Sequence, residues 1–108
     1  MLKIFRLVLR LFGFCPHYSV IICDDVPDKP AEKRLYVVGE KSIYWQAAMK
    51  CPCGCGDLIQ LPLTQGARPR WKAQVDKVTS PSLSPSVNRT TGCRSHFFLR
   101  EGRIVWCP

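Results

Sequence analysis

The stretch RSHFFLREGRIVWC, residues 94–107, decides the fold class. Aromatic and branched side chains lie on both sides of Glu101–Gly102, and glycine supplies the positive φ that a tight hairpin turn requires. A two-residue turn at this point predicts a β-hairpin in which His96 lies opposite Cys107. The chain is therefore expected to end in a hairpin that holds these two side chains next to each other at its open end.

Other segments upstream of the hairpin also have the composition of strands. Each is rich in branched and aromatic residues and is bounded by turn residues, and they cover 18–23 (as a buried strand), 35–39, 42–50, 57–63 and 71–75. A tight turn is expected at Gly39–Glu40, between the second and third of them. The chain shows no internal repeat and no long helical pattern after its start, so we predict a mainly β fold.

The first fourteen residues, MLKIFRLVLRLFGF, predict one N-terminal α-helix over 1–14. Lys3, Arg6 and Arg10 recur at helical spacing and form a narrow basic stripe on an otherwise apolar helix, and Gly13 is a natural stop. The segment is too short to span a bilayer. We expect it to pack by its apolar face and not to insert stably in a membrane; the cover of that face is the domain's own core, with a partner protein or a membrane surface as the alternatives.

Two segments between the expected strands have the composition of loops. The charged, proline-containing segment 24–34 and the serine- and proline-rich segment 79–92 are both predicted to be exposed. Long loops in compact domains are often functional. With 108 residues, the chain is long enough for one modest core, so we expect a single domain over 1–108.

Charge and cysteine content constrain the partners and the compartment. Sixteen Lys and Arg against eight Asp and Glu give a net charge of +8, which favours an anionic partner, either nucleic acid or an acidic protein face. The aromatic residues do not alternate with the basic ones as in a stacking platform, which argues against nucleic acid. Seven cysteines without a secretory leader pattern indicate a reducing cytoplasm, where clustered thiols more often bind metal than form disulfides.

The cysteines are arranged as two half-sites for zinc. CPCGCG (51–56) offers three thiols in five residues with glycines that allow tight turns, and CRSH (93–96) has the spacing of a zinc half-site. We therefore expect Zn²⁺ to stabilise the β domain. The candidates exceed the four positions of a structural zinc site: Cys51, Cys53, Cys55, Cys93, His96 and Cys107.

A thiol or imidazole left over beside the metal suggests reactivity. His96 is the only candidate general base near the cluster, and Ser82, Ser84 or Ser86 could reach it as the nucleophile of a Ser–His pair. A spare cysteine is the alternative nucleophile. The other interpretation is that His96 is the fourth zinc ligand and that no reaction occurs.

Three stretches within residues 44–107, namely CPCGCG, SLSPSV and GCRSHFFLREGRIVWC, resemble a family of small bacterial Cys/His proteins. Members of this family are encoded in operons with ubiquitin-like conjugation genes. The resemblance implies a zinc ion held by Cys51, Cys53, Cys55 and Cys93, with Cys107 as the reserve ligand.

The same resemblance implies a peptidase that processes or deconjugates a bacterial ubiquitin-like protein. His96 would be its base and Ser86, Ser84 or a cysteine its nucleophile, with the ubiquitin-like protein and its conjugating enzymes as partners. The alternative is a non-enzymatic zinc module that binds the ubiquitin-like protein, its enzymes or nucleic acid. Whether His96 coordinates the metal discriminates between the two functions.

Overall fold

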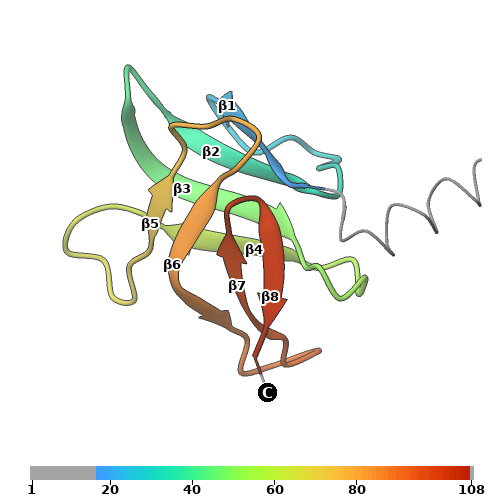
Figure 1. Cartoon of the computed structure of the whole chain (residues 1–108). Coiled ribbons are helices and arrows are strands. Elements are labelled where there is room, and N and C mark those ends of the chain that lie inside the picture. The colour runs from blue at the N-terminus through green and yellow to red at the C-terminus, as the bar shows by residue number, and fades with distance from the viewer. Residues whose placement is uncertain (1–16, 108) are drawn as a thin grey trace, which may run out of the picture.

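The computed structural model describes residues 17–107, which form eight strands in two four-stranded sheets (Figure 1). This arrangement confirms the expected mainly β fold, whereas the helix expected over 1–14 lies outside the described residues. No helix in the described part is long and apolar enough to cross a membrane. The strands of the first sheet are β1 (Ser19–Cys23), β2 (Arg34–Glu40), β3 (Ile43–Lys50) and β4 (Leu58–Pro62), and those of the second are β5 (Lys72–Gln74), β6 (Ser82–Asn88), β7 (His96–Arg100) and β8 (Arg103–Trp106).

One hydrophobic cluster joins the two sheets. Leu35 and Met49 of the first sheet and Phe97 and Leu99 of the second are fully buried in it. Burying a side chain of this size contributes about 1.5–3 kcal/mol, so the cluster fixes which face of each strand points inward. The alternate residues of β7, including His96, consequently lie on the outer face of the second sheet.

The C-terminal hairpin has the predicted turn and register. Gly102 has a φ of 79°, and a Cβ at this position would lie 3.0 Å from the Thr79 carbonyl oxygen, so only glycine fits. The backbone N–H of Cys107 donates to the His96 carbonyl at 2.9 Å, which holds the open end of the hairpin together. The paired residues are Arg100 and Arg103, Leu99 and Ile104, Phe98 and Val105, and Phe97 and Trp106.

The turn between β2 and β3 lies two residues later than predicted. Glu40 pairs with Ile43, and the turn residues Lys41 and Ser42 have φ values of 51° and 65°. Gly39 instead lies at a β-bulge, where a Cβ would collide with the Ile43 carbonyl. The glycine is therefore required by close backbone approach and not by the turn.

Strand β1 is less buried than predicted, whereas the charged loop that follows it agrees with its prediction. β1 pairs in parallel with β2 and lies at the edge of its sheet, and Ile21 and Ile22 are exposed, so the prediction of a buried strand there was wrong for these residues. The charged segment that follows is a loop up to Lys33, as expected. Its Ala31 N–H donates to the hydroxyl of Tyr36 at 2.7 Å, which fastens the loop to β2.

The prediction of a loop over 79–92 was wrong for its centre, which forms β6. Leu83 and Val87 are both buried in the core, and they anchor the strand between β5 and β7. The step from Leu83 to Val87 covers four positions in β6 but only two in β7. This bulge replaces the period-two alternation that identifies strands, which is why composition alone indicated a loop.

Candidate metal centre and catalytic pair

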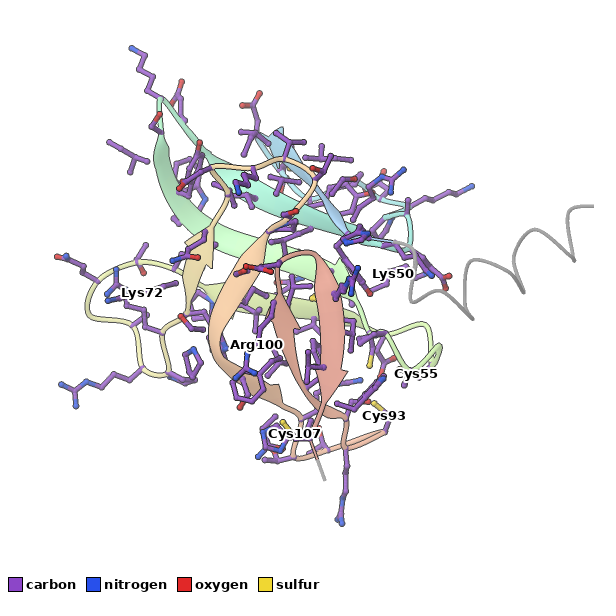
Figure 2. The ribbon with its side chains drawn as sticks, viewed as in Figure 1. Lys50, Cys55, Lys72, Cys93, Arg100 and Cys107 are labelled. Carbon is purple, nitrogen blue, oxygen red and sulfur yellow. The ribbon has the colours of Figure 1, made fainter. Side chains whose placement is uncertain are left out.

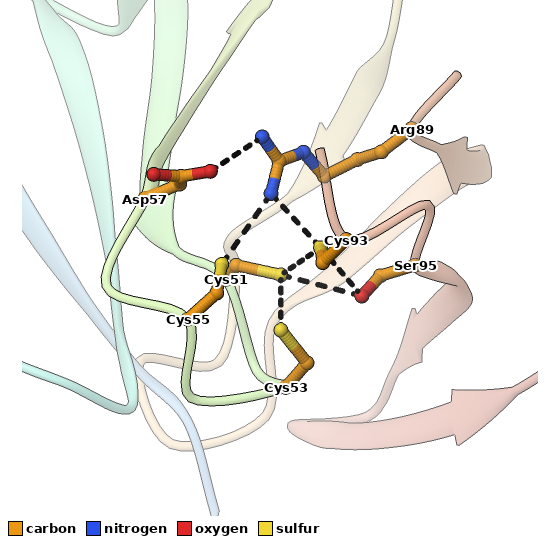
Figure 3. Close-up of polar contacts among 7 residues, drawn as sticks. All are labelled: Cys51, Cys53, Cys55, Asp57, Arg89, Cys93 and Ser95. Carbon is orange, nitrogen blue, oxygen red and sulfur yellow. Dashed lines mark hydrogen bonds and ion pairs between the residues drawn. The ribbon is translucent and has the colours of Figure 1, made fainter. Parts of the chain in front are cut away.

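Four cysteines from two connections meet in one cluster (Figure 3). Cys51, Cys53 and Cys55 lie between β3 and β4, and Cys93 lies between β6 and β7. Their Sγ atoms are all within 4.8 Å of one another. Zinc–sulfur bonds of about 2.3 Å in a tetrahedron place the sulfurs about 3.8 Å apart. The observed separations from Cys51 Sγ are 3.4 Å to Cys53 Sγ and 3.6 Å to Cys93 Sγ, slightly below this value, so the cluster can hold a metal ion after a small adjustment.

The connection between β3 and β4 folds tightly for local reasons. Gly54 and Gly56 have φ values of 90° and 87°, a conformation that glycine adopts without strain. The Cys51 N–H donates to the Asp57 carbonyl at 2.8 Å and closes the segment at its base. The result is a short, tightly folded segment in which Cys51, Cys53 and Cys55 direct their thiols toward the same place.

Arg89 and Ser95 surround the thiols with polar contacts. Arg89 Nη1 lies 3.0 Å from Cys93 Sγ and 3.5 Å from Cys55 Sγ, while its Nη2 forms an ion pair of 3.0 Å with Asp57. The Ser95 hydroxyl lies 3.1 Å from Cys93 Sγ and accepts from Cys51 Sγ at 3.5 Å. Contacts of this kind orient ligands around a metal, and the guanidinium offsets the negative charge of thiolates.

The cysteine thiols differ in their acidity. Hydrogen bonds from the Ser95 side chain and backbone lower the pKa of Cys93 to about 6. For Cys55 the backbone hydrogen bond from Asp57 lowers the pKa, but desolvation and the neighbouring thiols raise it to about 11 overall. Four thiolates in one place repel each other, so a bound cation is what would allow all of them to ionise.

Outside this cluster, a serine and a histidine on neighbouring strands are in hydrogen-bond contact. Ser86 Oγ lies 2.9 Å from His96 Nε2. Ser86 belongs to the bulge of β6, and bulges redirect side chains relative to a regular strand. When the hydroxyl donates to Nε2, the ring carries its own proton on Nδ1, which is the tautomer that can accept a second proton.

Backbone contacts hold both members of this pair. The indole Nε1–H of Trp71 donates to the Ser86 carbonyl at 3.3 Å. Asn88 pairs with His96, and the Arg89 N–H donates to the Ser95 carbonyl at 2.8 Å. The Ser86–His96 pair therefore lies on the two strands whose connection carries Cys93.

The remaining candidates from the sequence lie elsewhere. Ser84 is exposed and forms no hydrogen bond with His96 within the described residues, and the Ser82 hydroxyl accepts from the Glu101 N–H at 2.8 Å. Cys107 is not a member of the four-cysteine cluster, and Figure 2 shows it apart from Cys55 and Cys93. His96, whose Nε2 faces Ser86, is also outside that cluster.

Sequence reasoning did not identify Arg89, Ser95 or Trp71. Ser95 lies within CRSH, between the cysteine and the histidine that were singled out, so its position in the half-site was an available signal. Arg89 and Trp71 gave no such signal, because the folding of β6 between β5 and β7 is what brings them to the site.

The chain matches the model of a family described as bacterial ubiquitination-like system serine protease (BubE), over residues 22–107. The matched range includes the four cysteines, Ser86 and His96. No curated protein and no solved structure is significantly similar to the chain.

Proposed function

The chain belongs to the family of bacterial ubiquitination-like system serine proteases, and from this premise we propose that Ser86 is its nucleophile and His96 its general base. The observation that carries the proposal is the 2.9 Å contact between Ser86 Oγ and His96 Nε2. A serine is a weak nucleophile until a base within hydrogen-bond reach takes its proton. Ser86 satisfies this condition, whereas Ser84 has no such contact in the described part of the chain.

The reaction follows from the arrangement of these two side chains. His96 Nε2 takes the hydroxyl proton as Ser86 Oγ attacks the carbonyl carbon of the scissile bond, and it then donates that proton to the leaving amine. An ester between Ser86 and the acyl part of the substrate remains. Water, deprotonated by His96, hydrolyses this ester and restores both side chains.

The proposed substrate is a ubiquitin-like protein, either as a precursor or as a conjugate, and the partners are that protein and its conjugating enzymes. Support comes from the family description, which names a ubiquitination-like system. The non-enzymatic alternative would be favoured if His96 were a metal ligand with no serine nearby. The contact of His96 with Ser86, and four cysteines sufficient to complete a metal site without it, favour the enzyme.

We assign zinc to the cluster of Cys51, Cys53, Cys55 and Cys93, where it would act as a cross-link between two connections. An all-thiolate site is typical of closed, structural zinc, and thiolates select zinc among the common cellular metals. Such a site also fits a reducing cytoplasm. Catalysis then belongs to the serine and histidine, and the metal serves to hold the strands that carry them.

The test is cleavage of the ubiquitin-like precursor from the same operon by wild type, Ser86→Ala, His96→Ala and Ser84→Ala. Members of a nucleophile–base pair act as a unit, so loss of either Ser86 or His96 should lower kcat by about 10³-fold or more. Ser84→Ala is the matched control for the chemical step, because it changes the same chemical group two residues away on β6 and should retain kcat.

Metal content must be measured for each of these variants. Ser86→Ala and His96→Ala that retain the metal and lose turnover support the proposal. Full activity of Ser86→Ala would overturn the role of Ser86. Loss of metal together with unfolding in His96→Ala would instead identify that residue as a ligand.

A further inference from the structure

Two adjoining cavities form a groove on the second sheet. One has a volume of about 470 Å³ and is lined by residues that include Ser84 and Phe98. The other, of about 480 Å³, is lined by residues that include Lys77 and Arg103. Arg100, at the end of β7 and labelled in Figure 2, lines both cavities together with Gln74, Ser82 and Glu101, so the two cavities adjoin each other.

This groove begins next to the proposed catalytic pair. Phe98, which lines the groove, follows His96 by two positions on β7, where buried and less buried side chains alternate regularly. Ser84 and Ser86 both lie in the bulge of β6 opposite this part of β7. Same-face neighbours on a strand are about 6.6 Å apart. A peptide whose scissile bond lies at Ser86 can therefore continue directly into the groove as an extended chain.

The charged side chains that line the groove carry a net positive charge. Three cations (Lys77, Arg100 and Arg103) outnumber two acidic residues (Asp76 and Glu101), and His17 Nε2 accepts a hydrogen bond from Arg103 Nε at 3.2 Å. The Arg100 guanidinium lies 4.0 Å from the centre of the Phe98 ring, and this stacking fixes it over an apolar floor. A fixed cation near an apolar surface is suited to a side chain that carries a carboxylate, because charge complementarity favours an acidic ligand.

We propose that this groove, which we call the basic groove, binds an extended acidic segment of the substrate on the acyl side of the scissile bond. Arg100 and Arg103 are its specificity-determining residues. The inference rests on the proposed function, since processing and deconjugation share the tail that precedes the scissile bond and differ in the group that leaves. A groove can therefore bind the substrate in both reactions only if it binds the tail on the acyl side of the scissile bond.

Binding can be measured independently of catalysis with Ser86→Ala and a fluorescent peptide that has the sequence of the ubiquitin-like protein's C-terminal tail. In this background, the double change Arg100→Glu and Arg103→Glu should weaken binding by about tenfold or more, and added salt should reduce the difference. Arg68→Glu is the matched control for one charge reversal, because Arg68 is exposed and lines neither cavity. A tail peptide with its Asp and Glu changed to Asn and Gln should bind the Ser86→Ala protein more weakly than the unchanged tail peptide does.

The same substitutions in the active protein should raise KM for the precursor and leave kcat within about twofold, because uniform binding energy is removed. Equal binding by the double variant and Arg68→Glu would overturn the inference, as would a natural tail without acidic side chains. A single-stranded oligonucleotide that binds the groove more tightly than the tail would overturn it in favour of nucleic acid. If wild type fails to cleave the precursor, the proposed function falls, while the peptide binding still tests the groove.

Discussion

The cysteine cluster and the Ser86–His96 pair are neighbours, because Cys93 lies on the connection between the strands that carry Ser86 and His96, but they are built differently. Four thiols, a guanidinium and a buried hydroxyl meet in the cluster, and four of these six groups, those of Cys51, Cys93, Arg89 and Ser95, have more than one partner. The two side chains of the pair have one hydrogen bond, which joins them to each other within the described residues. The cluster is thus arranged for rigidity, whereas the pair has few restraints, as its proposed catalytic role requires. Changes to the first should affect folding and turnover together, and changes to the second turnover alone.

The largest effect is expected from breaking the cluster at its buried member. Cys51→Ser should abolish stoichiometric metal binding and lower the free energy of unfolding by more than about 4 kcal/mol, because a structural metal is a major part of the stability of a small domain. Activity should fall with it, since the connection that carries Cys93 also positions His96. Metal content and denaturant unfolding measure both effects.

Cys107→Ser is the control for that experiment, because this cysteine lies outside the four-cysteine cluster. It should keep the metal and change the unfolding free energy by less than about 1 kcal/mol. Equal losses of metal and of unfolding free energy in the two variants would show that the four-cysteine cluster is not the metal site. A Cys51→Ser protein that folds fully in the presence of a chelator would remove the structural role of the metal.

A smaller effect is expected from a change at Arg89, which contacts the thiols of Cys55 and Cys93 and the carboxylate of Asp57. Arg89→Gln removes the charge beside the thiolates, and loss of an outer contact of this kind typically weakens metal binding by about 10–100-fold. Competition with a chromogenic chelator measures this change. Arg94→Gln, at an exposed arginine on the same connection, is the matched control and should leave metal affinity unchanged. Equal affinity of both variants for the metal would contradict the role of Arg89.

Much of the fold follows from local sequence, and the exceptions have a common cause. The hairpin at Glu101–Gly102 was predictable to its register, because a two-residue turn fixes the pairing of both strands. β6 was not, because its bulge separates Leu83 from Val87 by four positions and removes the alternation. The turn after β2 was misplaced because Gly39 is required by contact with Ile43, a neighbour that only the folded sheet supplies.

The candidate site divides in the same way. Spacing gave six candidate ligands that include the four cysteines, because metal ligands cluster in short motifs and three of these cysteines lie within five residues. The family resemblance, and not spacing, selected the four. Choosing Ser86 over Ser84 was not possible from sequence, since both flank Pro85 in a similar context. The bulge that brings Ser86 to His96 depends on pairing with β7, which is a tertiary property.

The acidity of Cys93 gives a finer comparison within the cluster. Its pKa is lowered from 9.0 to about 6, first of all by the Ser95 hydroxyl. A lowered pKa stabilises the fold fully above pH 9, and this contribution is lost as the pH falls through 6. In metal-free protein, Ser95→Ala should move the pKa of Cys93 back toward 9.0 and reduce the thiolate present at neutral pH.

Ultraviolet absorbance of the thiolate during a pH titration measures this change, with Thr90→Ala as a control at an exposed hydroxyl on the same connection. Ser95 is buried, so unfolding curves must accompany the titration. An unchanged titration in a folded Ser95→Ala protein would show that other groups set the acidity of Cys93.

The smallest expected effect concerns Trp71, whose indole N–H donates to the Ser86 carbonyl. Trp71→Phe keeps an aromatic ring against the core but removes the donor, so the bulge loses one contact that holds Ser86 toward His96. A hydrogen bond contributes about 1 kcal/mol net, which corresponds to roughly a fivefold change in rate. We expect kcat to fall by about that factor, with KM and metal content unchanged, whereas Trp45→Phe, an exposed position on β3, should have no effect. A rise in KM at constant kcat would assign Trp71 to substrate binding instead, and unchanged kinetics would show that the strand pairing of β6 is sufficient to position Ser86.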